Sequence, residues 1–167
     1  DELTNLISKL GENIIIKRLS FIKNDAWKFQ KYLHNSVSED SGKLGVLLCF
    51  NSKAQENEEE NNLSKQICMH IAASDPKSLD IKSLDESLIS NEKEIYRAQL
   101  KSSGKPDEII DKIIDGKIKK YFEEVCLLEQ YFVIDNKIKI KDLISDFNKN
   151  HDSDFLIEDY YIFKLGT

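Results

Sequence analysis

The chain has 167 residues, enough for one ordinary domain or for a compact domain with an appendage. Hydrophobic residues make up 40% and charged residues 32%, which indicates a real core beneath a well-solvated surface. The net charge of -6 argues against nucleic acid as the main partner, because phosphate binding needs a basic surface. No apolar run in the sequence is long enough to cross a membrane.

The first residues predict a helix followed by a strand. Leu3, Ile7 and Leu10 recur at helical spacing, and Gly11 is expected to end the helix. Residues 13–23 (NIIIKRLSFIK) are rich in β-branched and aromatic residues and predict a strand. The chain begins with neither an initiator methionine nor a signal peptide, so we expect a processed product or a piece of a longer protein.

The next segments alternate between polar and apolar character. Residues 24–42 are polar and predict irregular structure, whereas 43–50 (KLGVLLCF) are apolar on both faces and predict a strand covered on each side. Residues 51–62 (NSKAQENEEENN) are a low-complexity polar run and predict a solvated loop or a disordered insertion. A short helix is expected to follow and to end at the Asp75–Pro76 dipeptide, because proline disfavours helical geometry in the residue before it.

The middle of the chain predicts an antiparallel helical hairpin of the coiled-coil type. Residues 85–102 are good helix formers with apolar residues seven apart. Gly104 is expected to end this helix, and Pro106 is tolerated in the first turn of the next one. The second helix carries an apolar stripe that consists of Ile110, Ile113, Ile114, Ile118, Tyr121, Phe122 and Val125.

The C-terminal segments complete the predicted fold. Residues 127–134 predict an extended segment, 140–147 a short amphipathic helix, and 155–165 (FLIEDYYIFKL) a final strand. Residues 13–22 align weakly with residues 154–163, which suggests two related strands. The predicted fold class is α+β: a small antiparallel sheet core packed with helices, with the hairpin inserted into it. We expect residues 1–85 and 125–167 to form the core and residues 86–124 to form the hairpin.

The residue types that carry most catalytic chemistry do not occur in a recognisable pattern. Cys49, Cys68 and Cys126 sit in apolar segments and predict buried thiols rather than disulfides or a zinc site. Cys68 and His70 are two apart on a predicted helix and point to different faces, so we expect no metal there. His70 itself is interpreted as a helix-surface or partly buried, hydrogen-bonded histidine. We expect no cofactor and no catalysis by the chain itself.

Six stretches occur in an order and spacing that resembles one protein family. They are LGENIIIKR (10–18), KLGVLL (43–48), CMHIAASDP (68–76), SGKP (103–106), DGKIKKY with EVCLLEQYFV (115–121 and 124–133), and FKLG (163–166). The family that they resemble is elongation factor Ts. The resemblance implies a translation factor that binds elongation factor Tu and promotes release of its GDP. It also implies a sheet core with an inserted helical hairpin, and no enzymatic activity.

The resemblance also suggests which residues contact a partner. His34 matches a position on the surface that meets factor Tu, and its alternative role is that of a local turn residue. Val133 and Ile134 match apolar positions that dock on factor Tu, with core packing as the alternative, whereas Phe132 is expected in the core. In the hairpin, four residues are expected to pack the two helices together, or alternatively to form a homodimer contact: Ile95, Tyr96, Ile110 and Ile114.

Parts of the family pattern are missing from this sequence. The family's N-terminal helical module and the first half of its core, with a "TDFVA" loop that disturbs the magnesium site of factor Tu, have no counterpart here. We therefore expect a chain that binds factor Tu but exchanges nucleotide poorly. The alternative is a structural or dimerisation module without exchange activity. The many Lys, Asn and Ile residues suggest an AT-rich genome, and hence a bacterial cytoplasm or a eukaryotic organelle such as a mitochondrion or an apicoplast-type plastid.

Overall fold

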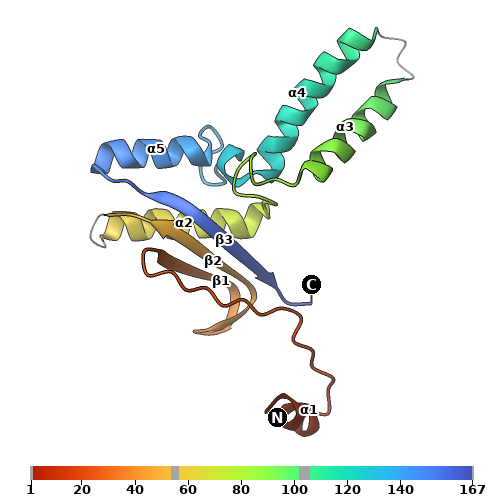
Figure 1. The fold of residues 1–167 in the computed structure, drawn as a ribbon. Coiled ribbons are helices and arrows are strands. Elements are labelled where there is room, and N and C mark those ends of the chain that lie inside the picture. The colour runs from red at the N-terminus through yellow and green to blue at the C-terminus, as the bar shows by residue number, and fades with distance from the viewer. Residues whose placement is uncertain (1, 54–56, 102–105, 167) are drawn as a thin grey trace.

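The computed structural model describes residues 2–53, 57–101 and 106–166. It has the predicted α+β class, with a small sheet, helices against it and two long helices that project from the body (Figure 1). The elements in chain order are α1 (Glu2–Leu10), β1 (Lys28–Ser38), β2 (Ser41–Asn51), α2 (Glu58–Ser74), α3 (Glu86–Lys101), α4 (Asp107–Val125), the 3-10 turn η1 (Leu127–Glu129), α5 (Ile140–His151) and β3 (Leu156–Lys164).

The sheet has three antiparallel strands in the order β1-β2-β3. The apolar β2 forms its centre, where Leu48 lies between Gln30 of β1 and Tyr160 of β3. Leu48 and its same-face neighbours are buried in the main core, and Cys49 on the opposite face is also buried. The prediction that residues 43–50 form a strand covered on each side is confirmed, and the structure adds that this strand is the central one.

The main core lies between the sheet and the helices α2 and α5. Leu63, Ile67 and Ile71 recur every four residues along α2 and form its buried face. Phe155, which comes just before β3, stacks on the ring of Phe50 with 4.8 Å between ring centroids. The buried face of α5 joins the same cluster, so one core holds the sheet and both helices together.

The limits of α2 have clear local causes. The side chain of Asn57 accepts a hydrogen bond from the Glu60 amide at 2.7 Å, which caps the first turn. Asp75 ends the helix in a left-handed conformation, directly before Pro76, as predicted.

The prediction that residues 51–62 form a solvated or disordered run is wrong in its second half. Residues 54–56 lie outside the described residues, but α2 already begins at Glu58 and Glu60 is buried. The Glu60 carboxylate pairs with the ammonium of Lys28 at 2.7 Å and accepts a hydrogen bond from Ser52. This ion pair connects α2 to the start of β1, so the glutamate-rich run contributes to the fold.

The N-terminal segment departs most from expectation. The helix α1 ends at Gly11, whose φ of +71° favours glycine, as predicted. Residues 13–23, however, form no strand, and Leu19 and Phe21 are exposed. None of the described backbone hydrogen bonds joins this segment to the sheet, so its β-branched residues lack the ladder that a strand requires.

The strand β1 comes instead from the polar segment for which we expected irregular structure. Residues 28–38 pair with the whole length of β2. The polar β1 sequence has few apolar side chains of its own to pack, and pairing with the apolar β2 stabilises it as a strand. The weak repeat between residues 13–22 and 154–163 therefore has no counterpart in the fold, because only its second copy is a strand.

The two projecting helices, α3 and α4, lie side by side (Figure 1). They share a second hydrophobic cluster built on Ile110, Ile114 and Ile118, which is separate from the main core. The basic run that contains Ile118 turns that isoleucine inward, as predicted, and Lys117 lies over the Tyr96 ring. The predicted bend at Gly104 falls in residues 102–105, which lie outside the described residues.

None of the described helices combines the length and the apolar character that a membrane span needs.

Candidate functional site

A short loop between η1 and α5 presents two apolar side chains to solvent. Residues 127–134 were predicted to be extended, but a 3-10 turn comes first and a closed loop follows. The loop closes because the Phe132 amide donates to the Ile138 carbonyl at 2.9 Å and the Ile140 amide donates to the Gln130 carbonyl at 3.0 Å. We call residues 131–139 the tip loop.

The tip loop separates one buried side chain from two exposed ones. Phe132 is buried in the main core, as predicted. Val133 and Ile134, the next two residues, are 50% and 58% exposed. A buried aromatic ring beside an exposed apolar pair fixes the loop on the body while it leaves the pair free for contact.

A fully buried histidine holds the loop from beneath. His70 of α2 is 0% exposed, and its Nδ1 lies 3.3 Å from the amide nitrogen of Val133. Its Nε2 lies 2.9 Å from the Gln130 side-chain oxygen. The Gln130 side-chain amide in turn donates to the Glu124 carbonyl at the end of α4, at 2.7 Å. The expectation of a surface or partly buried histidine is wrong in degree, since His70 is completely enclosed, but it is hydrogen-bonded as expected.

Burial lowers the pKa of His70 below its ordinary value of 6.5, and the Gln130 hydrogen bond opposes this shift only partly. The neutral ring therefore predominates in the folded protein at neutral pH. A neutral ring can accept one hydrogen bond and donate another, which matches its two neighbours.

The lowered pKa predicts a pH-dependent stability. Above pH 6.5 the contribution of neutral His70 is fully present, and below it the unfolded chain gains a proton that the folded chain resists. The free energy of unfolding is thus expected to fall as the pH drops from about 7 to about 5. Asp75 and Glu129, whose pKa values are lowered from 3.8 and 4.5, titrate below this window.

Urea denaturation at the two pH values measures this effect. The variant His70→Asn, which has no titrating ring at this position, is expected to show a shallower loss of stability between them. Equal losses in the two proteins would contradict the assignment of the pH dependence to His70.

The base of the tip loop is held by a network of charges. Lys139 pairs with Glu123 at 2.8 Å and with Glu129 at 3.3 Å, and Lys141 also binds Glu129 at 2.8 Å. The hydrogen bond to Glu123 is the main cause that raises the pKa of Lys139. Burial alone would raise the pKa of Glu129, but the two lysines together lower it. These pairs join α4, η1 and α5 at the foot of the loop.

His34 lies on a different element from the tip loop. It is exposed on the edge strand β1, opposite Leu44, and its Nδ1 lies 3.2 Å from the hydroxyl of Tyr32. Among the described residues, no hydrogen bond or ring contact joins His34 to Val133 or Ile134. The helix α2 connects the two places, because it packs on β1 and also carries His70.

The four expected hairpin residues divide into two groups. Ile110 and Ile114 are buried in the hairpin cluster, and Tyr96 packs against it. Ile95 lies outside the cluster and is exposed, as are Leu88 and Ile109. The pair of helices α3 and α4 thus shares an apolar seam and also carries exposed apolar side chains.

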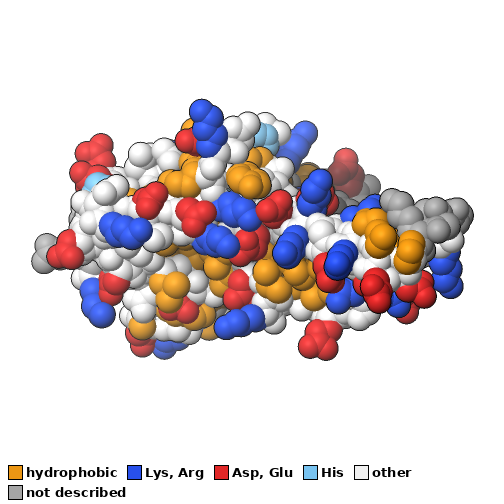
Figure 2. Space-filling view, turned by 90° about the horizontal axis from the view of Figure 1, so that it is seen from above, with side chains coloured by type: hydrophobic (Ala, Val, Ile, Leu, Met, Phe, Trp, Pro, Cys, Tyr) orange, Lys and Arg blue, Asp and Glu red, His pale blue; other side chains and the backbone are white. Residues whose placement is uncertain are grey.

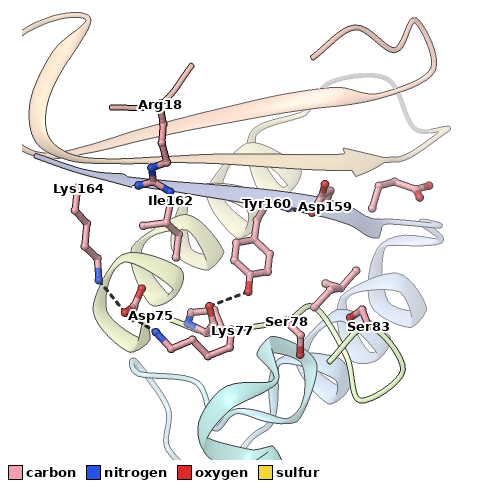
Figure 3. A pocket seen from close by; sticks show the side chains of 12 residues that line it. Arg18, Asp75, Lys77, Ser78, Ser83, Asp159, Tyr160, Ile162 and Lys164 are labelled. Atoms are coloured by element: carbon pink, nitrogen blue, oxygen red, sulfur yellow. Dashed lines mark hydrogen bonds and ion pairs between the residues drawn. The ribbon is translucent and has the colours of Figure 1, made fainter. Parts of the chain in front are cut away.

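A cleft of about 640 Å³ lies along the outer edge of β3, against the segment that follows α2 (Figure 3). Asp75 pairs with Lys164 at 2.9 Å and with Lys77 at 3.2 Å, and the Tyr160 hydroxyl donates to the Pro76 carbonyl. The hydrogen bond from Lys164 is the first cause that lowers the pKa of Asp75. The charged side chains that line the cleft are balanced, three basic and three acidic: Arg18, Lys77, Lys164, Asp75, Glu158 and Asp159.

The three cysteines are free and buried, as predicted. Burial raises the pKa of the Cys49 thiol to about 11 and that of the Cys68 thiol to about 12, so both are protonated and unreactive at neutral pH. Within the described parts of the chain, no group of three or more His, Cys, Asp or Glu side chains could hold a metal ion. Figure 2 shows basic and acidic side chains interspersed over the face that it presents, without a basic patch for phosphate.

Comparisons with known proteins agree on one family. Residues 1–167 match the family model described as elongation factor TS. The chain is 37% identical over 166 residues to elongation factor Ts of Rhodospirillum centenum, which covers 99% of this chain and 54% of the relative. The corresponding protein of Clostridium acetobutylicum is 39% identical, with 99% and 52% covered, and that of Rickettsia bellii is 33% identical, with 99% and 54% covered. The chain spans about half the length of the curated relatives that it matches.

Proposed function

Since this chain belongs to the elongation factor Ts family, we propose that it binds elongation factor Tu and acts as a non-catalytic guanine nucleotide exchange component. The observation that supports this most is the exposed pair Val133 and Ile134 on the tip loop. Adjacent apolar side chains on a preformed loop are typical anchors of a protein interface, because they lose little freedom when they are buried.

Exchange requires an energetic coupling between two ligands of factor Tu. If the exchange factor weakens GDP binding by some factor, GDP weakens binding of the exchange factor equally. Release of GDP from factor Tu makes or breaks no covalent bond, so the exchange factor needs no catalytic group. We propose that this chain supplies the hold on factor Tu through the tip loop and His34, and that it couples weakly to GDP because it spans about half of its relatives' length.

The hairpin is proposed as a separate unit of the molecule. Residues 86–124 have their own hydrophobic cluster, which supports treating them as an insertion between the core parts 1–85 and 125–167. The exposed Leu88, Ile95 and Ile109 favour a second candidate function, in which the hairpin binds a second copy of the chain. Sedimentation combined with capture on immobilised factor Tu separates binding of factor Tu from self-association. A dimer that does not bind factor Tu would favour dimerisation as the only function.

The compartment follows from the partner. The matched relatives are bacterial, which supports a role wherever bacterial-type translation takes place, either in a bacterial cytoplasm or in an organelle.

The exchange proposal predicts binding without fast release. Factor Tu of the same organism is loaded with a fluorescent GDP and mixed with this chain, and release and complex formation are followed in parallel. We expect a stable complex with nucleotide-free factor Tu but little acceleration of GDP release. Fast release by this chain would show that the unmatched half of the relatives is dispensable for exchange.

A further inference from the structure

We propose that His70 is a positioning residue for the contact with factor Tu, because its buried ring fixes the backbone from which Val133 and Ile134 project. This inference rests on the proposed function of the tip loop. His70 does not touch the partner, since it is fully enclosed beneath the loop.

The hydrogen-bond partners of His70 fix the state of the ring. The Val133 amide can only donate, so Nδ1 must accept from it across 3.3 Å. The proton therefore resides on Nε2, which donates to the Gln130 oxygen at 2.9 Å. One neutral tautomer satisfies both neighbours at once.

The same ring interacts with one residue just before the tip loop and with two residues inside it. It holds the side chain of Gln130 before the loop, lies 6.0 Å from the Phe132 ring, and holds the amide of Val133. The side-chain amide of Gln130 also donates a hydrogen bond to the carbonyl of Glu124 at the end of α4. The loop is thereby tied to both α2 and α4 at the residue where its side chains turn outward.

The role of this anchor differs from that of the other loop contacts. The hydrogen bonds from the amides of Phe132 and Ile140 close the loop, and they do not involve His70. Only the bond to His70 joins the Val133 backbone to the body, as far as the described hydrogen bonds show. Without this hydrogen bond the loop would still close, but Val133 and Ile134 would be less ordered. The entropy cost of ordering them on binding would then weaken the affinity for factor Tu.

Two amide substitutions separate the two bonds of the ring. The oxygen of His70→Asn occupies a position near that of Nδ1 and can still accept from Val133, whereas the nitrogen of His70→Gln lies near Nε2 and can still donate to Gln130. Titration of factor Tu with the full chain is expected to give about tenfold weaker binding for His70→Gln and a loss of less than about threefold for His70→Asn. Thermal unfolding is expected to show similar destabilisation of the two variants.

The proposal would be overturned if His70→Asn and His70→Gln lost the same amount of affinity for factor Tu, in proportion to their loss of stability. A check that needs no variant is amide hydrogen exchange of the wild-type chain, in which the Val133 amide is expected to be protected. Rapid exchange at Val133 in the folded protein would overturn the proposal, whether or not His70→Gln folds.

The failure of this inference can be told apart from the failure of the proposed function. If the wild-type chain does not bind factor Tu, the proposed function is wrong. If the wild type binds and replacement of Val133 and Ile134 by aspartate leaves binding unchanged, the tip loop is not the contact, and the positioning role is wrong with it. If that replacement weakens binding but His70→Gln does not, only the positioning role is wrong.

Discussion

A chain that carries Val133→Asp and Ile134→Asp is expected to bind factor Tu at least about 100-fold more weakly than the wild type. Each apolar anchor in an interface contributes on the order of 1–3 kcal/mol when it is buried, and two of them correspond to a factor of this size. An aspartate in their place adds the cost of removing a charge from water. Both side chains are exposed in the free chain, so the fold itself is expected to tolerate the change.

The matched control places the same charges on other exposed apolar positions. The double variant Leu19→Asp with Ile81→Asp adds the same two negative charges. Both side chains are exposed and neither lies on the tip loop, so the fold and the loop are expected to stay unchanged. Kinetics on immobilised factor Tu are expected to show a fast dissociation for the tip-loop variant and near wild-type kinetics for the control. An equal effect in the two variants would mean that added charge, rather than the loop, decides binding.

Replacement of Phe155 by alanine is expected to lower the free energy of unfolding by about 3–5 kcal/mol. The ring is 1% exposed, stacks on Phe50 and meets the edge of Phe147 at 6.2 Å between centroids. Its removal leaves a cavity where β2, α5 and the start of β3 meet, and the surrounding elements cannot collapse fully into it. Urea denaturation at neutral pH measures the change.

Phe21→Ala provides the comparison, because the same atoms are removed from a ring that is 89% exposed. It is expected to change the stability by less than about 0.5 kcal/mol. A loss below about 1 kcal/mol for Phe155→Ala would contradict the packing described for the main core.

Elements with a strong local signal were predictable from the sequence. Gly11 and the Asp75–Pro76 dipeptide predicted helix ends correctly, and the apolar run 43–50 predicted a strand covered on each side. The exchange of roles between residues 13–23 and 28–38 was not predictable, because strand formation depends on a partner. Gln30 illustrates this, since its side chain accepts from Ser64 and its carbonyl accepts from Cys68, both on a helix that begins later in the chain.

The site was predictable only in part, for a similar reason. The resemblance drew attention to Val133 and Ile134, and the structure places both on the surface. The partnership of His70 with Gln130 spans 60 residues of sequence and leaves no periodic signal. Glu60 is a comparable case: its polar neighbours in the sequence predicted solvent, but Lys28 and Ser52 satisfy its carboxylate in the buried position.

Binding to factor Tu is tested most directly by an equilibrium titration of nucleotide-free factor Tu, from the same organism, with the wild-type chain. We expect saturable binding with one chain per factor Tu. We also expect that GDP with magnesium weakens binding of the chain by the same factor by which the chain weakens binding of GDP. A titration in which the chain fails to bind factor Tu in either state would contradict the proposed function.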